Sequence, residues 1–306
     1  MIAYFVTITI LVCVAALVGL ALNLQWGLAG LVNFGVVGFV AIGAYAAALL
    51  APEIGWLPAM AVSAALSAAF SAGLALLSIR LEENYLAIVT IGFGEVVRLV
   101  ILNEPWLTNG ALGIANIPRP FAALGEAVGG DAVFLVFAVA LVALAFVTLE
   151  GIARSPFGRA LRAIRDDATV TSALGKNVFA LRVRAFAVGG AVMGIAGALH
   201  AYYLTYIDPG QFTPIVTAYA FMAVIAGGRG SNVGLLVGAG SIMALLEGTR
   251  FLKDFITVID GVQLSALRLG LIGVGIVLLL ILRPQGLAPE PRRRASDVLP
   301  DQTTRP

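Results

Sequence analysis

The sequence has little charge, one cysteine and one histidine. Charged residues make up 12% of the 306 residues, about half the share of an ordinary soluble domain. The single cysteine, Cys13, excludes a disulfide framework and a thiolate metal site. The single histidine, His200, excludes a histidine metal cluster, so we predict no metal site. The net charge of +2 is too small to indicate nucleic-acid binding.

Residues that could perform catalysis are scarce as well. No two carboxylates share the interior of one apolar run, so we predict that the chain is not an enzyme. A phosphate-binding loop is also missing, because Gly175 and Lys176 are followed by Asn177 and the residue five places before Gly175 is Val170. We therefore expect no cofactor on this chain, and any use of ATP requires a separate subunit.

Apolar residues are abundant, at 60% of the chain, and the mean hydropathy is +1.00. Stretches of about 20 residues carry no charge, which is enough to cross about 30 Å of hydrocarbon, so a lipid bilayer is the expected surrounding. Because no ten-residue alternating pattern occurs, we predict an all-α fold, a polytopic bundle of about eight to ten transmembrane helices. The predicted spans are residues 2–22, 28–50, 57–79, 85–102, 132–149, 185–204, 214–225, 233–247 and 266–282.

The distribution of lysine and arginine predicts the orientation. Residues 103–131 hold Arg119 against three acids, whereas residues 151–184 are rich in bases, which predicts an outer loop and a cytoplasmic segment respectively. We assign residues 1–287 to one membrane domain and the polar, Pro-rich residues 288–306 to a disordered cytoplasmic tail. The bases of the cytoplasmic segment are Arg154, Arg159, Arg162, Arg165, Lys176, Arg182 and Arg184.

The basic cytoplasmic segment has the signals of a short amphipathic helix. Ser155 can cap a helix whose first position is Pro156, and Gly175 would end a second short helix. One interpretation is a solvated basic loop that only sets the topology. The other is a surface helix whose free apolar side docks into a groove of a partner. The apolar side would consist of Ala160, Leu161 and Ile164.

The fourth predicted span is the most polar. Glu95 and Arg98 stand three residues apart and can form an ion pair on one helical face. Charges in a bilayer are costly, so the pair indicates either a clamp between helices, with Arg98 reaching toward water, or a solute pathway. Tyrosines near span ends equally fit interface anchors. In the pathway interpretation the polar lining consists of Asn33, Tyr45, Tyr85, Thr90, Glu95 and Arg98.

Several motifs follow one another in order over residues 31–287. They are residues 31–35 (LVNFG), 84–98 (NYLAIVTIGFGEVVR), 108–120 (TNGALGIANIPRP), 155–167 (SPFGRALRAIRDD), 227–231 (GGRGS) and 283–287 (RPQGL). With these motifs the chain resembles the inner-membrane permeases of high-affinity branched-chain amino acid ABC transporters. Asn33 stands where relatives often have serine and Arg229 occupies a usually apolar position, which leaves the solute open.

The resemblance implies a permease subunit of an ATP-driven importer in the bacterial inner membrane. Its implied partners are a second homologous permease, two cytoplasmic ATP-binding subunits and a periplasmic solute-binding protein. The implied solute is a branched-chain or other amino acid; urea and amide permeases share the architecture, and an autonomous secondary transporter or channel is the alternative from another class. The residues implied to contact the ATPase are Arg159, Arg162, Ile164, Arg165, Asp166, Asp167, Ala173, Leu174 and Gly175.

Overall fold

A computed structural model describes residues 2–77, 83–121 and 130–255, with short pieces at 270, 273–275, 277, 281, 283 and 286–288. Helices dominate these residues, and β pairing among them is limited to an isolated bridge between Ile114 and Ile207. The long helices are α1 (Ile2–Leu22), α2 (Val36–Ile54), α3 (Trp56–Leu76), α4 (Glu83–Asn103), α7 (Gly130–Arg154), α10 (Val178–Leu204), α11 (Pro214–Gly227) and α12 (Asn232–Phe255).

Among the described residues, seven helices are long and apolar enough to cross a membrane, and residues Asn232–Leu246 of α12 form a shorter apolar helix. These helices confirm the predicted all-α bundle. The predicted spans through residue 247 each correspond to one of the long helices, although boundaries differ. Most of the span predicted at residues 266–282 lies outside the described residues, as does the tail predicted at 288–306 except for residue 288.

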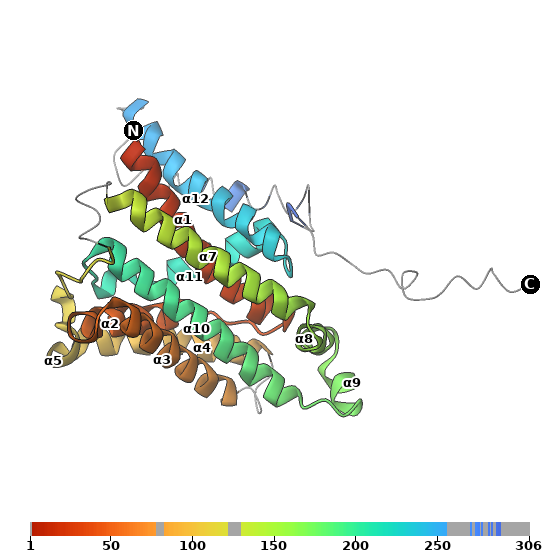
Figure 1. The fold of residues 1–306 in the computed structure, drawn as a ribbon. Helices are drawn as coiled ribbons and strands as arrows, with labels where there is room; N and C mark the ends of the chain where they lie inside the picture. Colours follow the sequence, from red (N-terminus) through yellow and green to blue (C-terminus); the bar gives the residue numbers. More distant parts are fainter. Residues whose placement is uncertain are drawn as a thin grey trace, which may run out of the picture.

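Small residues occupy the centre of the bundle, where α2, α3 and α10 pack against one another (Figure 1). A methyl group at Gly43 would collide with the backbone of Gly194, and one at Gly197 would collide with the carbonyl oxygen of Val40. The α2 and α10 backbones can therefore approach closely, which is how membrane helices gain packing contacts without a hydrophobic driving force. Across α3, the Ser67 hydroxyl donates to the Phe39 carbonyl over 2.8 Å.

The prediction that the second span begins at residue 28 is wrong. The chain continues from α1 into a π-helical turn, η1 (Asn23–Leu28), and then runs without helix until α2 begins at Val36. The stretch is as apolar as a membrane helix, but it is not helical and most of it is buried inside the protein. Irregular backbone at membrane depth is tolerated where protein groups satisfy it, and here side chains from other helices do so.

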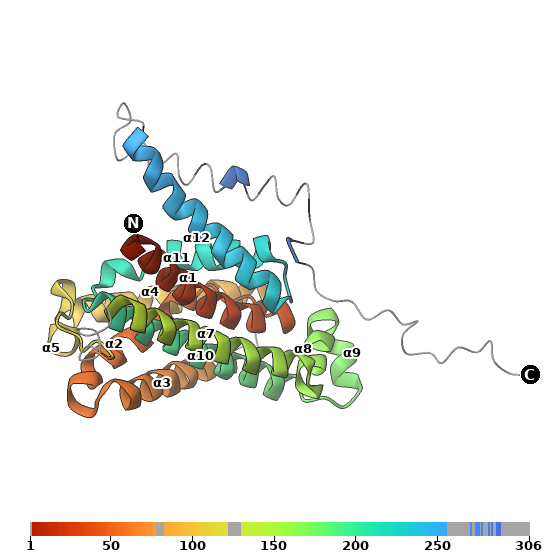
Figure 2. The ribbon, with the colours of Figure 1, turned by 45° about the horizontal axis from the view of Figure 1, so that its top comes forward.

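The bundle has two different ends, which Figures 1 and 2 show at opposite sides of the molecule. At one end lie the short helix α5 (Pro105–Thr108), the turn η3 (Gly110–Leu112) and the turn η4 (Pro209–Gln211), joined by the Ile114–Ile207 bridge. At the other end, α8 (Pro156–Asp166) and α9 (Ala168–Ala173) project past the long helices. The first end holds the predicted outer loop, and the second holds the predicted cytoplasmic segment.

Candidate functional site

The corner between α7 and α8 is built by local signals that the sequence displays. The Ser155 hydroxyl accepts from the Gly158 amide over 3.3 Å and donates to the Ile152 carbonyl over 2.7 Å, with Pro156 at the first helical position. These contacts confirm the predicted cap. A methyl group at position 158 would collide with the carbonyl oxygens of Ile152 and Ala153, so glycine permits the turn to be this tight. The segment is thus a fixed corner and not a loose basic loop.

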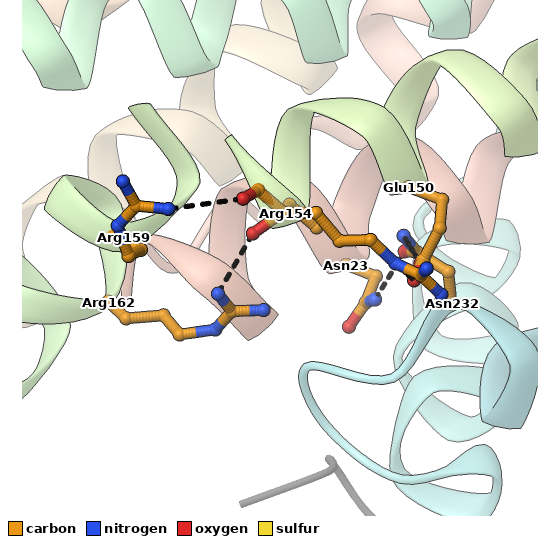
Figure 3. Close-up of polar contacts among 7 residues, drawn as sticks. Asn23, Glu150, Arg154, Arg159, Arg162 and Asn232 are labelled. Carbon is orange, nitrogen blue, oxygen red and sulfur yellow. Dashed lines mark hydrogen bonds and ion pairs between the residues drawn. The ribbon is translucent and has the colours of Figure 1, made fainter. Parts of the chain in front are cut away.

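Arginines of α8 bind backbone carbonyls at the end of the bundle that carries α8 and α9. Arg159 Nη1 donates to the Arg154 carbonyl over 3.3 Å and Arg162 Nη1 to the Ala153 carbonyl over 2.9 Å, so both reach back to the end of α7 (Figure 3). Positive charge at a helix C-terminus is favourable because the last carbonyls lack helical partners. The guanidinium contacts therefore hold α8 against α7.

Arg165 connects α8 to a different part of the chain. Its Nη1 donates to the Gly27 carbonyl in η1 over 2.6 Å, and its Nε lies 3.5 Å from the adjacent Asp166 carboxylate. Gly30, at φ +75°, passes beneath the Arg165 side chain, where a Cβ would lie 3.1 Å from Arg165 Cγ. A displacement of α8 would consequently act directly on the π-helical turn that ends α1.

The apolar side of α8 is not free, which corrects the docking interpretation given above. Leu161 and Ile164 are 0% and 2% exposed, because α8 rests on α7, α10 and η1. Exposed apolar side chains occur on and just after α9 instead, where Val170 is 54% and Leu174 is 75% exposed. Helical spacing predicted an apolar stripe on α8 correctly, but spacing alone does not distinguish a partner's groove from the chain's own bundle.

The other residues that the resemblance implies in contact with the ATPase lie at the tip formed by α8 and α9. Asp167 caps α9 by accepting from the amides of Thr169 and Val170 over 2.8 and 3.0 Å. Ala173 ends α9, and Gly175 follows in a left-handed conformation at φ +77°, as predicted for the end of the second short helix. Asp166, Ala173 and Gly175 are exposed. Arg159 and Leu174 are exposed as well, whereas Ile164 is buried.

A partly buried polar chain links three helices behind this tip. Asn23 Nδ2 donates to Asn232 Oδ1, and Asn232 Nδ2 donates to Glu150 Oε2, both over 2.9 Å. Glu150 Oε1 accepts from Arg154 Nε over 2.8 Å, while Asn23 Oδ1 accepts from the Gly230 amide over 2.9 Å. Figure 3 shows Asn23, Asn232, Glu150 and Arg154 together. The ends of α1 and α7 and the start of α12 therefore share one network.

This network was not predicted from the sequence. Asn23 and Glu150 each stand at the end of an apolar run, and such a position is ordinary for a residue that meets water. Their contacts with Asn232 join positions 209 and 82 residues apart, and a single sequence does not display such contacts. Arg229, noted as a departure from the family pattern, lies over the Trp26 ring at 4.8 Å and donates to the Trp26 carbonyl over 3.3 Å.

The residues predicted to line a solute pathway do not form one cluster. Asn33 and Thr90 are buried and support the irregular stretch before α2, since Asn33 Nδ2 donates to Gln25 Oε1 over 2.8 Å and Thr90 Oγ1 accepts from the Phe34 amide over 2.9 Å. Tyr45 is buried elsewhere, with its ring 5.9 Å from that of Phe212. These contacts give Asn33 and Thr90 structural roles.

The other predicted pathway residues share the outer side of α4. Tyr85 is 57% exposed. Glu95 and Arg98 form the predicted ion pair, with Arg98 Nε donating to Glu95 Oε2 over 3.0 Å. The side chains of Glu95 and Arg98 are 38% and 26% exposed. The predicted set thus splits into a buried structural group and a group at the surface of this chain.

A cavity of about 270 Å³ lies between α1, α11 and α12. Its lining is mostly apolar, and at its edge His200 Nε2 lies 3.1 Å from Gln211 Oε1, with Gln211 Nε2 donating to Asp208 over 2.7 Å. None of the predicted pathway residues lines it. The polar groups at its edge are engaged with one another.

A match to the sequence model of a protein family identifies the class of protein. The model described as branched-chain amino acid transport system / permease component matches residues 4–282. The chain belongs to this family. With seven apolar helices in the part that the structure describes, it is a multi-pass membrane permease, and this family is not a class of enzymes.

Relatives from bacteria and archaea agree with the family. The chain is 35% identical to the high-affinity branched-chain amino acid transport permease LivM of Escherichia coli, over 94% of this chain and 70% of that protein. It is 28% identical to a probable LivM of Methanocaldococcus jannaschii, over 90% of each. It is also 26% identical to LivH of Escherichia coli, over 76% of this chain and 80% of that protein. No solved structure matches the chain.

Proposed function

We propose that this chain is one membrane subunit of an ATP-driven importer of branched-chain or other amino acids in the bacterial inner membrane. A second homologous permease subunit completes the solute path, two cytoplasmic ATP-binding subunits hydrolyse ATP, and a periplasmic binding protein delivers the solute. The chain itself binds no cofactor. The observation that carries the proposal, together with the family, is the α8–α9 tip, which projects from the bundle and is tied to it by Arg162 and Arg165.

The exposed surface of the tip suits a partner on the ATP side. Val170 and Leu174 present apolar area, and the exposed residues of the same segment include Arg159 and Asp166, with charges of opposite sign. A small apolar centre with a polar rim is the usual composition of a protein interface. Ile164 serves differently from the way first expected, because it anchors α8 from inside the chain and does not meet a partner.

The contacts behind the tip offer a route for force. Closure of the ATP-binding subunits displaces α8, Arg165 transfers the displacement to η1, and the Asn23–Asn232–Glu150 chain carries it to α12 and α7. Switching elements of this kind work when packed segments have two discrete arrangements. The bundle then alternates between outward-open and inward-open states, and solute crosses between the two permease subunits.

A matched pair of substitutions tests this function. Leu174→Glu places a charge at the centre of the proposed interface, and we expect it to weaken binding of the ATP-binding subunits at least tenfold, about 1.4 kcal/mol or more. Leu112→Glu is the control, because Leu112 is equally exposed, at 75%, at the opposite end of the bundle. Copurification and ATP-driven uptake in proteoliposomes are the measurements. Equal copurification of the two variants would contradict the proposed interface.

The identity of the solute and the dependence of transport on ATP need separate tests. The guanosine ABC transporter permease NupQ of Bacillus subtilis, 24% identical over 68% of this chain, is a relative whose name gives another solute. Direct binding of amino acids, urea and amides to the cognate periplasmic protein distinguishes an amino acid importer from an amide importer. A secondary transporter using Glu95 as an ion site would transport without ATP, whereas the proposed importer would not.

A further inference from the structure

The rotation of α4 about its axis is fixed by contacts on one side. The Phe93 ring stacks on the Phe39 ring of α2 with centroids 4.9 Å apart, and Thr90 accepts from the Phe34 amide. A Cβ on Gly38 would lie 2.9 Å from Gly94 Cα, so the two backbones touch. Because α4 cannot turn without losing these contacts, its opposite side must face away from the part of the chain that the structure describes.

That opposite side carries an ion pair inside a 21-residue helix, with Glu95 two residues past the helix midpoint and Arg98 one turn further on. The Arg98 guanidinium reaches back along the helix toward Glu95, and so does not extend to the outer end of α4 to meet water. Gly92, on the same side, is exposed and has nothing within 4 Å of a Cβ built on it. A pair of ions and an open glycine at this depth are poorly suited to hydrocarbon, because intramembrane charges face protein or a water-filled path.

The outer side of α7 gives a contrast within the same molecule. Between residues 132 and 147 its exposed residues are alanine, valine and leucine, among them Val139 and Leu144 at 47% and 61%. Such a surface fits lipid without any partner. The α4 side has apolar members too, with Ile88 at 65% and Val96 at 57%, but the ion pair flanks them. The two helices therefore face different surroundings.

We propose that this side of α4, residues Tyr85, Ile88, Gly92, Glu95, Val96 and Leu99, is the surface that packs on the second permease subunit, with the Glu95–Arg98 pair facing the solute path between them. The inference rests on the proposed function, which supplies that subunit. LivM and LivH of Escherichia coli, two permeases named for one transport system, both resemble this chain. The paired ions offer an acceptor and a donor at one place, which suits the opposite charges of a zwitterionic amino acid.

Photocrosslinking in the assembled transporter tests the surface. Benzoylphenylalanine is placed at Ile88 or Val96 in α4, and at Leu144 or Val139 in α7 as exposure-matched controls. We expect the α4 positions to give adducts whose mass identifies a permease subunit, and the α7 positions to give lipid adducts. Lipid adducts alone from α4, or adducts with any other protein, would overturn the proposal. If the transporter copurifies with its ATP-binding subunits and imports solute while α4 meets only lipid, this inference fails and the proposed function stands.

A double neutralisation tests the role of the ion pair. Glu95→Gln with Arg98→Gln removes both charges together, so neither is left unpaired and assembly should survive. We expect the adduct from position 88 to persist while uptake falls at least about tenfold, because the path loses both charged groups. Wild-type uptake by this variant would show that the pair does not face the solute. Loss of the adduct together with uptake would show instead that the pair is a clamp.

Discussion

At the scale of single residues, buried amides replace backbone partners that regular helices would supply. Gln25, Asn23 and Asn33 all lie in or beside the break between α1 and α2 and are 0% exposed. Asn33 Oδ1 accepts from the Gly35 amide over 2.9 Å, and Asn23 Oδ1 accepts from the buried Gly230 amide. A buried amide left without a partner is costly. These side chains therefore allow irregular backbone inside a membrane protein.

Substitution of Asn23 measures this contribution. Asn23→Leu removes the partners of the Gly230 amide and of Asn232 Oδ1, while Asn232 Nδ2 keeps its bond to Glu150. We expect a loss of about 1–3 kcal/mol in the free energy of unfolding. Asn103→Leu is the control, because Asn103 is exposed and bonds within its own helix to the Leu99 carbonyl; its effect should stay within about 0.5 kcal/mol. Thermal unfolding in detergent is the measurement, and equal midpoints for the two variants would contradict the assigned role.

At the scale of elements, the corner between α7 and α8 determines where the tip points. Ser155 caps α8, Arg162 holds it to the last turn of α7, and Gly158 allows the closest approach. Leu161 and Ile164 then secure α8 from below. The corner is rigid because polar and apolar contacts act on both sides of the same short helix.

Two alanine substitutions test the corner. Gly158→Ala places a methyl group against two backbone carbonyls that cannot move aside cheaply, and we expect about 1–3 kcal/mol of destabilisation together with weaker coupling of ATP hydrolysis to uptake. Gly151→Ala lies in the same connection in open space, and we expect it to be neutral or to stabilise α7 by up to about 1 kcal/mol. Unfolding midpoints and the ratio of uptake to hydrolysis are measured. A Gly158→Ala variant as well coupled as Gly151→Ala would exclude this role for the corner.

Local chemistry made some elements predictable from the sequence. Ser155, Pro156 and Gly175 mark helix ends through contacts with near neighbours, and the structure places them as expected. The start of α2 was not predictable in this way, because residues 28–35 are apolar and differ from membrane helix only through bonds to distant groups such as Thr90. The start of α10 at Val178, earlier than the predicted 185, follows from the Asn177 cap, which the basic residues nearby obscured.

The candidate site likewise has residues that the sequence could predict and residues that it could not. The Glu95–Arg98 pair was predictable because its members stand one helical turn apart. The sequence could not reveal that Ile164 faces the bundle while Leu174 faces outward, since both positions fit an amphipathic pattern. The Asn23–Asn232–Glu150 chain joins segments far apart in the sequence, and only the packed bundle brings them together.

At the scale of the whole molecule, the two ends of the bundle differ in charge and in structure. The end with α8 and α9 holds most of the basic residues of the connection between α7 and α10, and Arg229 joins them there beside Trp26. The other end holds α5, η3 and Arg119, whose Nη2 donates to Asp131 over 2.6 Å. Excess lysine and arginine favours the cytoplasmic side. The α8–α9 tip can couple ATP hydrolysis to uptake only if it lies on the side of the membrane where ATP is present.

Accessibility labelling tests that requirement most directly. In a Cys13→Ala background, Leu174→Cys and Leu112→Cys each supply one thiol, on side chains that are both 75% exposed at opposite ends of the bundle. In intact cells, a membrane-impermeant maleimide should label the cysteine at 112 and spare the one at 174. Inverted membrane vesicles stripped of the ATP-binding subunits, which would otherwise cover position 174, should give the reverse. Labelling of position 174 from outside intact cells would contradict the account, because no ATP-binding subunit could then reach the tip.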